Sequence, residues 1–193
     1  MSVDRNARRP ASESPWRVPV KDLVHSAGIQ RTLRHTWPAP EQVGTPVLGV
    51  VAGEPVDVDI RLEAVHEGVL VTGTADLTLT GECSRCLDPI EAGHTADLQE
   101  LFLAEPSPED DEDQHLIVYE TIDLEPVLRD AVVTALPFQP VCRPDCEGLC
   151  ADCGVRLEDV PAGHAHERLD PRWAALADLV DREKTSTPET EER

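Results

Sequence analysis

Apolar and charged residues alternate strictly over residues 56–62. Side chains of a β-strand point alternately to opposite faces, so this pattern predicts a strand with one buried face. The residues predicted to be buried are Val56, Val58, Ile60 and Leu62. Residues 16–24, 69–80 and 90–103 also have extended patterns, and Thr and Val in them favour strands. Turn residues between segments 56–62 and 69–80, and between 69–80 and 90–103, indicate that these three strands are antiparallel neighbours.

A helical period appears over residues 124–136, where apolar side chains recur every three or four positions. Asp123 is the predicted N-cap, Pro126 fits the first turn, and Pro137 ends the helix. A second helix is predicted to begin at Asp170-Pro171, with a buried stripe of Trp173, Leu176, Ala177 and Val180. The fold class expected is therefore α+β, with an antiparallel, barrel-like sheet and one main amphipathic helix.

Composition divides the chain into four parts. Residues 1–15 are polar and Arg-rich, and we expect a disordered basic arm. Residues 16–141 should form the β-rich body, residues 142–181 a Cys/His-rich zinc-binding segment with the second helix, and residues 182–193 a disordered tail. Within the body, residues 104–115 hold six acids and two prolines and are expected to form a mobile loop.

The net charge of -21 is unevenly distributed. Residues 1–40 hold seven basic residues against three acidic ones, and the rest of the chain holds 10 basic against 35 acidic residues. Such a body repels nucleic acid, whose binding depends on Lys and Arg, and attracts a basic protein. The alternative is that the acidity serves only to keep the protein in solution. The basic arm could itself contact RNA. We find no export signal and no apolar run long enough to cross a bilayer, so we expect a cytoplasmic protein without membrane contact.

The chain has six cysteines, and four of them lie within residues 142–153. Cys83 and Cys86 form one CxxC pair, Cys150 and Cys153 form another, and Cys142 and Cys146 lie between them in sequence. In a reducing compartment this grouping favours metal ligands over structural disulfides. Zinc is the expected ion, because it accepts four nitrogen or sulfur ligands in a tetrahedron.

Six ligands do not divide into tetrahedral sites, but His164 and His166 raise the number to eight. The preferred grouping places Cys83, Cys86, Cys142 and Cys146 in one site and Cys150, Cys153, His164 and His166 in another. Two other groupings remain open. The four cysteines of residues 142–153 could share one ion, or the two CxxC pairs could form a zinc ribbon. Both histidines could also be simple surface residues, and the CxxC pairs could be redox dithiols.

Two runs carry a family resemblance. They are Gly81-Glu82-Cys83-Ser84-Arg85-Cys86-Leu87 and residues 140–154, which have the spacing C-x3-C-x-G-L-C-x2-C-G. With the helix before the second run and Asp170-Pro171 after it, they resemble the YceD family of bacterial and plastid proteins, named for large ribosomal RNA subunit accumulation. Family members often have C-x-C where this chain has residues 164–166. The resemblance implies a role in synthesis, processing or stability of large-subunit (23S) ribosomal RNA.

Residue patterns typical of catalytic sites are not found, and a site with four protein ligands is structural, because a catalytic zinc keeps an open position. We therefore expect a non-enzymatic ribosome biogenesis factor with structural zinc. Its expected partner is a basic ribosomal protein or a large-subunit precursor particle, bound through the acidic surface. The alternative is a thiol-based redox or metal-responsive protein that uses the CxxC motifs.

Overall fold

The computed structural model describes residues 14–24, 26, 28–41, 43–106 and 114–166. It divides into two compact units, Met1–Cys146 and Glu147–Arg193, so that Cys142 and Cys146 belong to the first unit. Three expectations lie wholly or largely outside the described residues: the basic arm, the charged tail and the helix from Asp170. The acidic stretch of residues 104–115 also falls largely outside them.

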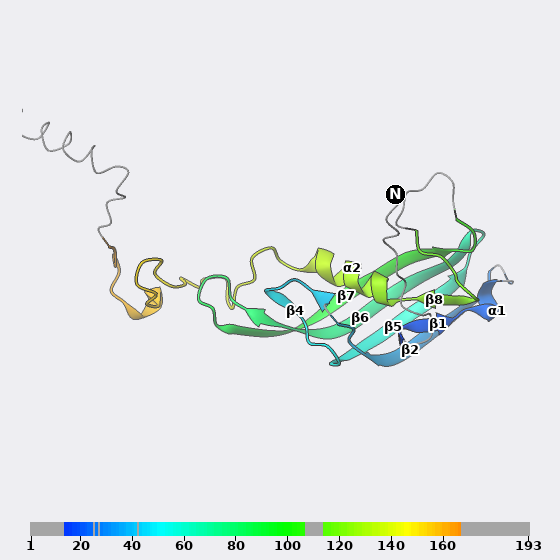
Figure 1. The fold of residues 1–193 in the computed structure, drawn as a ribbon, viewed down its shortest axis with the longest axis horizontal. Helices are drawn as coiled ribbons and strands as arrows, with labels where there is room; N and C mark the ends of the chain where they lie inside the picture. The colour runs from blue at the N-terminus through cyan, green and yellow to red at the C-terminus, as the bar shows by residue number, and fades with distance from the viewer. Residues whose placement is uncertain (1–13, 25, 27, 42, 107–113, 167–193) are drawn as a thin grey trace, which may run out of the picture. The chain divides into compact units, whose positions relative to one another are not determined.

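The first unit is built on a six-stranded antiparallel sheet (Figure 1). Its longest strands are β6 (Gly68–Glu82) and β7 (Pro89–Leu103), which pair along their whole length as one hairpin. The other edge of β6 pairs with β5 (Pro55–Ala64), and beyond it with β4 (Leu48–Val50). The outer strands are β2 (Gln30–Pro38), which pairs with β5, and β3 (Val43–Gly44), which pairs with β4. No pairing of β2 with β7 is recorded among the described residues.

Alternation in β5 sets the two faces of this sheet. Val56, Val58, Ile60 and Leu62 are all at most 2% exposed, as predicted. Residues paired with this face on the neighbouring strands are buried too. They are Val69, Val71 and Ala75 of β6 and Ala96, Leu98 and Phe102 of β7. The predicted antiparallel sheet is confirmed. Strands β5, β6 and β7 begin and end within two residues of the segments predicted from the sequence.

A single helix of three turns, α2 (Glu125–Ala135), packs against β7 on the buried face of the sheet. Its buried side chains are Val127, Leu128 and Val132, which belong to the predicted stripe. The N-cap is Leu124, one residue after the predicted Asp123, and its side chain makes no capping hydrogen bond. Asp123 Oδ1 instead accepts from the Glu125 N–H (3.1 Å), which satisfies one of the free donors of the first turn. Leu136 ends the helix in an extended conformation before Pro137.

The N-terminal part of the body differs from the prediction. Only Arg17–Pro19 forms a strand, β1, which pairs with β8 (Thr121–Asp123) in a separate two-stranded sheet. Lys21–Val24 forms a helical turn, α1, in place of the second half of the expected strand. Alternation over so few residues does not separate the two conformations, because Val20 and Leu23 are also spaced as in a helix and both are buried.

Three short helices, α1, α2 and the 3-10 turn η1 (Leu157–Asp159), complete the described structure. None of the helices in the described part of the chain is long and apolar enough to span a membrane.

Candidate metal centres

The turn between β6 and β7 and the segment after α2 bring four thiols together. We call this group centre 1: Cys83, Cys86, Cys142 and Cys146, whose sulfur atoms all lie within 4.8 Å of one another. The Cys83 and Cys146 sulfurs are 3.9 Å apart, and those of Cys86 and Cys142 are 3.6 Å apart. A tetrahedron with Zn–S bonds of about 2.3 Å has edges of about 3.8 Å, whereas a disulfide needs about 2.05 Å. All six cysteines of the chain are free.

Backbone hydrogen bonds fix the shape of the β6–β7 turn. Cys83 N–H donates to Asp88 O (2.8 Å) and Leu87 N–H donates to Cys83 O (2.9 Å), which closes the CxxC loop. Ser84 attaches this loop to the segment after α2, because its N–H donates to Pro140 O (2.8 Å). Arg85 Nη1 donates to Cys146 O (2.8 Å) and so places a cation beside the thiols.

Three of the four thiols of centre 1 are buried, whereas Cys142 is exposed. Cys83, Cys86 and Cys146 are at most 6% exposed, and Ile90 and Val141 pack against them as a small apolar cluster. Ile90 also packs against the main core of the sheet. Centre 1 therefore lies at the end of the β6–β7 hairpin, with three thiols in the interior of the first unit and the Cys142 side at the surface.

The thiols of centre 1 oppose one another's ionisation when no cation is present. Burial raises the pKa of the Cys83 thiol, but backbone N–H groups around the sulfur, beginning with that of Cys142, lower it overall to about 6. The Asp88 backbone N–H lowers the pKa of Cys86, yet burial and the three neighbouring thiols raise it overall to about 12. A divalent cation removes this opposition, since it binds thiolates and releases their protons. The donor set thus fits a soft or borderline divalent ion such as zinc.

The second unit contains a second group, which we call centre 2: Cys150, Cys153, His164 and His166, with ligand atoms within 4.8 Å of one another. The Cys153 sulfur lies 3.4 Å from His164 Nε2, and the two His Nε2 atoms are 3.0 Å apart. The corresponding tetrahedral edges are about 3.6 Å for S···N and about 3.3 Å for N···N, given Zn–N bonds of about 2.0 Å. These residues therefore match a Cys₂His₂ zinc set to within a few tenths of an ångström.

Centre 2 has no apolar core around it. Of the described residues 147–166, only Gly148 is buried, and none is a buried hydrophobic side chain. Hydrogen bonds hold the loop instead: Cys150 N–H donates to Val155 O (2.8 Å) and Gly154 N–H donates to Cys150 O (2.8 Å). Gly154 has φ +72°, which a glycine adopts without strain. Backbone N–H groups, first that of Cys153, lower the pKa of Cys150 and favour its thiolate.

All eight residues that the sequence analysis named are thus placed in two groups of four. The groups coincide with the preferred of the three groupings that the sequence left open. Sequence reasoning had no signal for Ser84 and Pro140, which join the two halves of centre 1 through a backbone contact.

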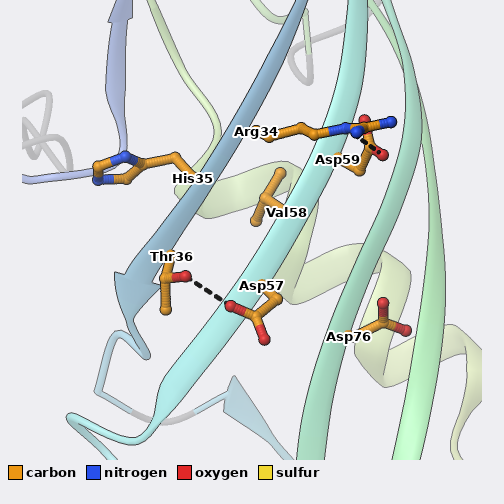
Figure 2. A pocket seen from close by; sticks show the side chains of 7 residues that line it. All are labelled: Arg34, His35, Thr36, Asp57, Val58, Asp59 and Asp76. Atoms are coloured by element: carbon orange, nitrogen blue, oxygen red, sulfur yellow. Dashed lines mark hydrogen bonds and ion pairs between the residues drawn. The ribbon is translucent and has the colours of Figure 1, made fainter.

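A polar hollow of about 530 Å³ lies elsewhere on the first unit, over β2, β5 and β6 (Figure 2). Asp57 and Asp76 face each other directly across β5 and β6, and like charges in that position repel. Thr36 Oγ1 donates to Asp57 Oδ1, and Arg34 forms an ion pair with Asp59 (2.8 Å). The alternation of β5 predicts that Asp57 and Asp59 face solvent, but the opposition of Asp76 depends on register, which the sequence does not give.

Comparison with known proteins supplies the family. Residues 71–180 match the family described as large ribosomal RNA subunit accumulation protein YceD. The uncharacterized protein Rv2926c of Mycobacterium tuberculosis is 43% identical, over 86% of this chain and 82% of the relative. The uncharacterized protein ML1660 of Mycobacterium leprae is 38% identical (92% and 83%), and YlbN of Bacillus subtilis, also uncharacterized, is 27% identical (58% and 68%).

No solved structure matches this chain. The family match covers β6 from Val71 on, all of β7 and α2, and every residue of both centres. It also agrees with the resemblance found in the two cysteine runs. The chain therefore belongs to the YceD family of large ribosomal RNA subunit accumulation proteins.

Proposed function

We propose that this chain is a non-enzymatic ribosome biogenesis factor that supports synthesis, processing or stability of large-subunit (23S) ribosomal RNA. It acts in the cytoplasm and contains two structural zinc ions, one in each centre. The family match carries the ribosomal part of this proposal. The two complete sets of four ligands carry the structural part, because a fully ligated zinc has no open position for a substrate or a water molecule.

Zinc in centre 1 would hold together parts of the first unit that are distant in sequence. Cys86 and Cys142 are separated by 56 positions, and Cys83 and Cys146 by 63. A metal bond between them fixes the tip of the β6–β7 hairpin to the segment after α2. Zinc in centre 2 would organise a segment whose described residues lack a buried hydrophobic side chain, as in small domains that fold only with metal. Both ions keep binding surfaces in shape.

The partner would be a basic ribosomal protein or a large-subunit precursor particle. Support comes from the net charge of -21 and from the Asp-rich hollow, where Asp57, Asp59 and Asp76 are arranged on one sheet face. Such a surface attracts Lys- and Arg-rich proteins over long distances and repels bare RNA. The Arg-rich residues 1–15 could add an RNA contact.

Depletion of the protein in its own host tests this function. We expect 23S ribosomal RNA and large subunits to fall relative to 16S ribosomal RNA, with recovery on expression of the wild-type chain. The paired substitution Asp57→Asn/Asp76→Asn removes two carboxylates without a change of size and should complement poorly. It should also reduce salt-sensitive association with large-subunit precursors. An unchanged 23S to 16S ratio after depletion would contradict the proposal.

The exposure of Cys142 and Cys153 favours a second candidate, a thiol-based redox or metal-responsive protein, because oxidants can reach both. Thiol titration of the native protein separates the two functions. Zinc-bound thiolates stay unreactive until a chelator is added, whereas redox thiols react at once and form disulfides.

A further inference from the structure

Three large apolar side chains are exposed around centre 1. Val47 is 53% exposed, Leu87 is 61% exposed and Phe138 is 96% exposed. We call these three residues the knuckle patch. Single exposed apolar residues are common on protein surfaces, so exposure alone shows nothing.

The placement is shared. Val47 O accepts a hydrogen bond from Glu82 N–H (3.2 Å), the residue before Cys83. Leu87 N–H donates to Cys83 O, and Phe138 lies two residues before Pro140, whose carbonyl accepts from Ser84. All three residues therefore belong to segments attached directly to residues 82–84. In Figure 1, β4, the β6–β7 turn and the segment after α2 come to the same end of the sheet.

The backbone at Leu87 is strained. Its φ is +62°, a conformation that costs a residue with a side chain about 1–2 kcal/mol and costs glycine nothing comparable. Glycine at this position would relieve the backbone strain. The exposed Leu87 side chain adds little burial energy to offset that strain. Strain of this kind, retained at a surface loop, points to a role for the side chain in binding. Phe138 lies in the short segment between the end of α2 at Ala135 and Pro140, whose carbonyl accepts a hydrogen bond from the Ser84 hydroxyl.

Shape and charge indicate what covers the patch. A hollow of about 540 Å³ lies beside Val47, lined by β3, β4 and the end of β6. Glu82 and Glu91 are exposed on the same hairpin, and Arg143 forms an ion pair with Asp145. Arg85 donates to the neutral Cys146 carbonyl, so these three acids outnumber the two arginines by one. Four thiolates around the proposed divalent ion would add a formal charge of about −2. The surroundings of the patch are therefore negative, which fits a partner with apolar side chains inside a rim of Lys and Arg.

We propose that the knuckle patch is the apolar anchor of the interface with a basic protein of the large ribosomal subunit. This inference rests on the proposed function and adds the residues that hold the partner once charge has attracted it. Buried aromatic and aliphatic anchors carry most of the affinity of an interface, while charged rims mainly raise the rate of association.

Binding measurements with proteins extracted from purified large ribosomal subunits of the host test the inference. The immobilised full chain is incubated with this extract, retained proteins are identified, and the affinity of each is measured with the purified protein. Phe138→Ser and Val47→Ser should each weaken binding about tenfold or more. Ile29→Ser is the matched control, because Ile29 is 49% exposed outside the patch, and its affinity should stay within twofold of wild type.

Leu87→Gly separates binding from folding. It removes the strain at φ +62°, so the melting temperature should stay equal or rise, while the affinity falls. Equal affinities of the wild type and all patch variants would overturn the inference and leave the proposed function standing. Retention of no large-subunit protein by the wild type would overturn both. Binding that ribonuclease abolishes, or a dimer that Phe138→Ser dissociates, would identify RNA or a second copy as the occupant and also overturn it.

Discussion

The two centres should contribute to stability in different ways, and Cys86→Ser tests this. A metal bound in centre 1 would close a loop of 56 positions between Cys86 and Cys142. In the chain-entropy treatment of cross-links, closing such a loop stabilises the folded state by about 4 kcal/mol. Each kcal/mol lowers the melting temperature of a chain of this size by about 2–4 °C, so loss of the metal should lower it by about 8–16 °C.

Cys153→Ser is the matched substitution in centre 2. There a bound metal would close only the 11 positions between Cys153 and His164, for which the same treatment gives about 3 kcal/mol. This stabilisation belongs to the second unit. We therefore expect the melting temperature of the first unit to change by less than about 2 °C, while hydrogen exchange at Cys150 and Gly154 becomes fast.

Near-UV circular dichroism of the buried pair Trp16 and Trp37, whose ring centroids are 5.0 Å apart, reports the unfolding of the first unit. Metal content measured on the same samples confirms which ion each variant has lost. The reasoning would be refuted if Cys86→Ser lost its ion without a fall in melting temperature. It would also be refuted if Cys153→Ser lowered the melting temperature of the first unit as much as Cys86→Ser does.

Three further outcomes are expected. The purified chain should contain two zinc ions, and a chelator should make all six cysteines reactive; one ion would remove the histidines from the ligand set. Tyr119 (φ +52°) and Glu120 (φ +56°) form a two-residue turn of the kind that favours Asn-Gly. Tyr119→Asn/Glu120→Gly should raise the free energy of unfolding in urea by about 1 kcal/mol, and an unchanged or lower value would contradict this. Gly73→Ala should destabilise by more than about 2 kcal/mol in the same assay, because its Cβ would lie 2.1 Å from Asp59 O, whereas Gly93→Ala, with nothing within 4 Å, should change stability little.

Strands with one buried face could be predicted from the sequence because burial leaves a period of two along the chain. In β5, all four apolar residues of the period are buried, and the register with β2 and β6 follows the same alternation. The strand expected over residues 16–24 was wrong over Lys21–Val24, because a segment of nine residues holds too few apolar positions to separate the two periods. Which strands lie next to each other depends on long-range packing. No local sequence pattern therefore predicted that β4 pairs with the end of β6.

The ligands could be predicted for a different reason. Thiol and imidazole groups at such short spacing are typical of metal sites, so residue type alone named all eight candidate ligands. The grouping could not be decided from spacing, because Cys142 and Cys146 are close in sequence to Cys150 and distant from Cys83. The fold decides it, since the hydrogen bond of Ser84 to Pro140 brings the β6–β7 turn to the segment after α2.

The position of centre 1 explains why a metal would be used there in place of a larger apolar core. The β6–β7 hairpin is 15 residues long on each side, and its tip carries only a small cluster of Cys83, Cys86 and Cys146 with Ile90 and Val141. The three small cysteine side chains and two partly buried neighbours bury too little apolar area to fix the end of a hairpin against a distant segment. Four metal–thiolate bonds would do so within a few ångströms. The surrounding side chains, Leu87 and Phe138 among them, then need not pack inward and remain free to contact a partner.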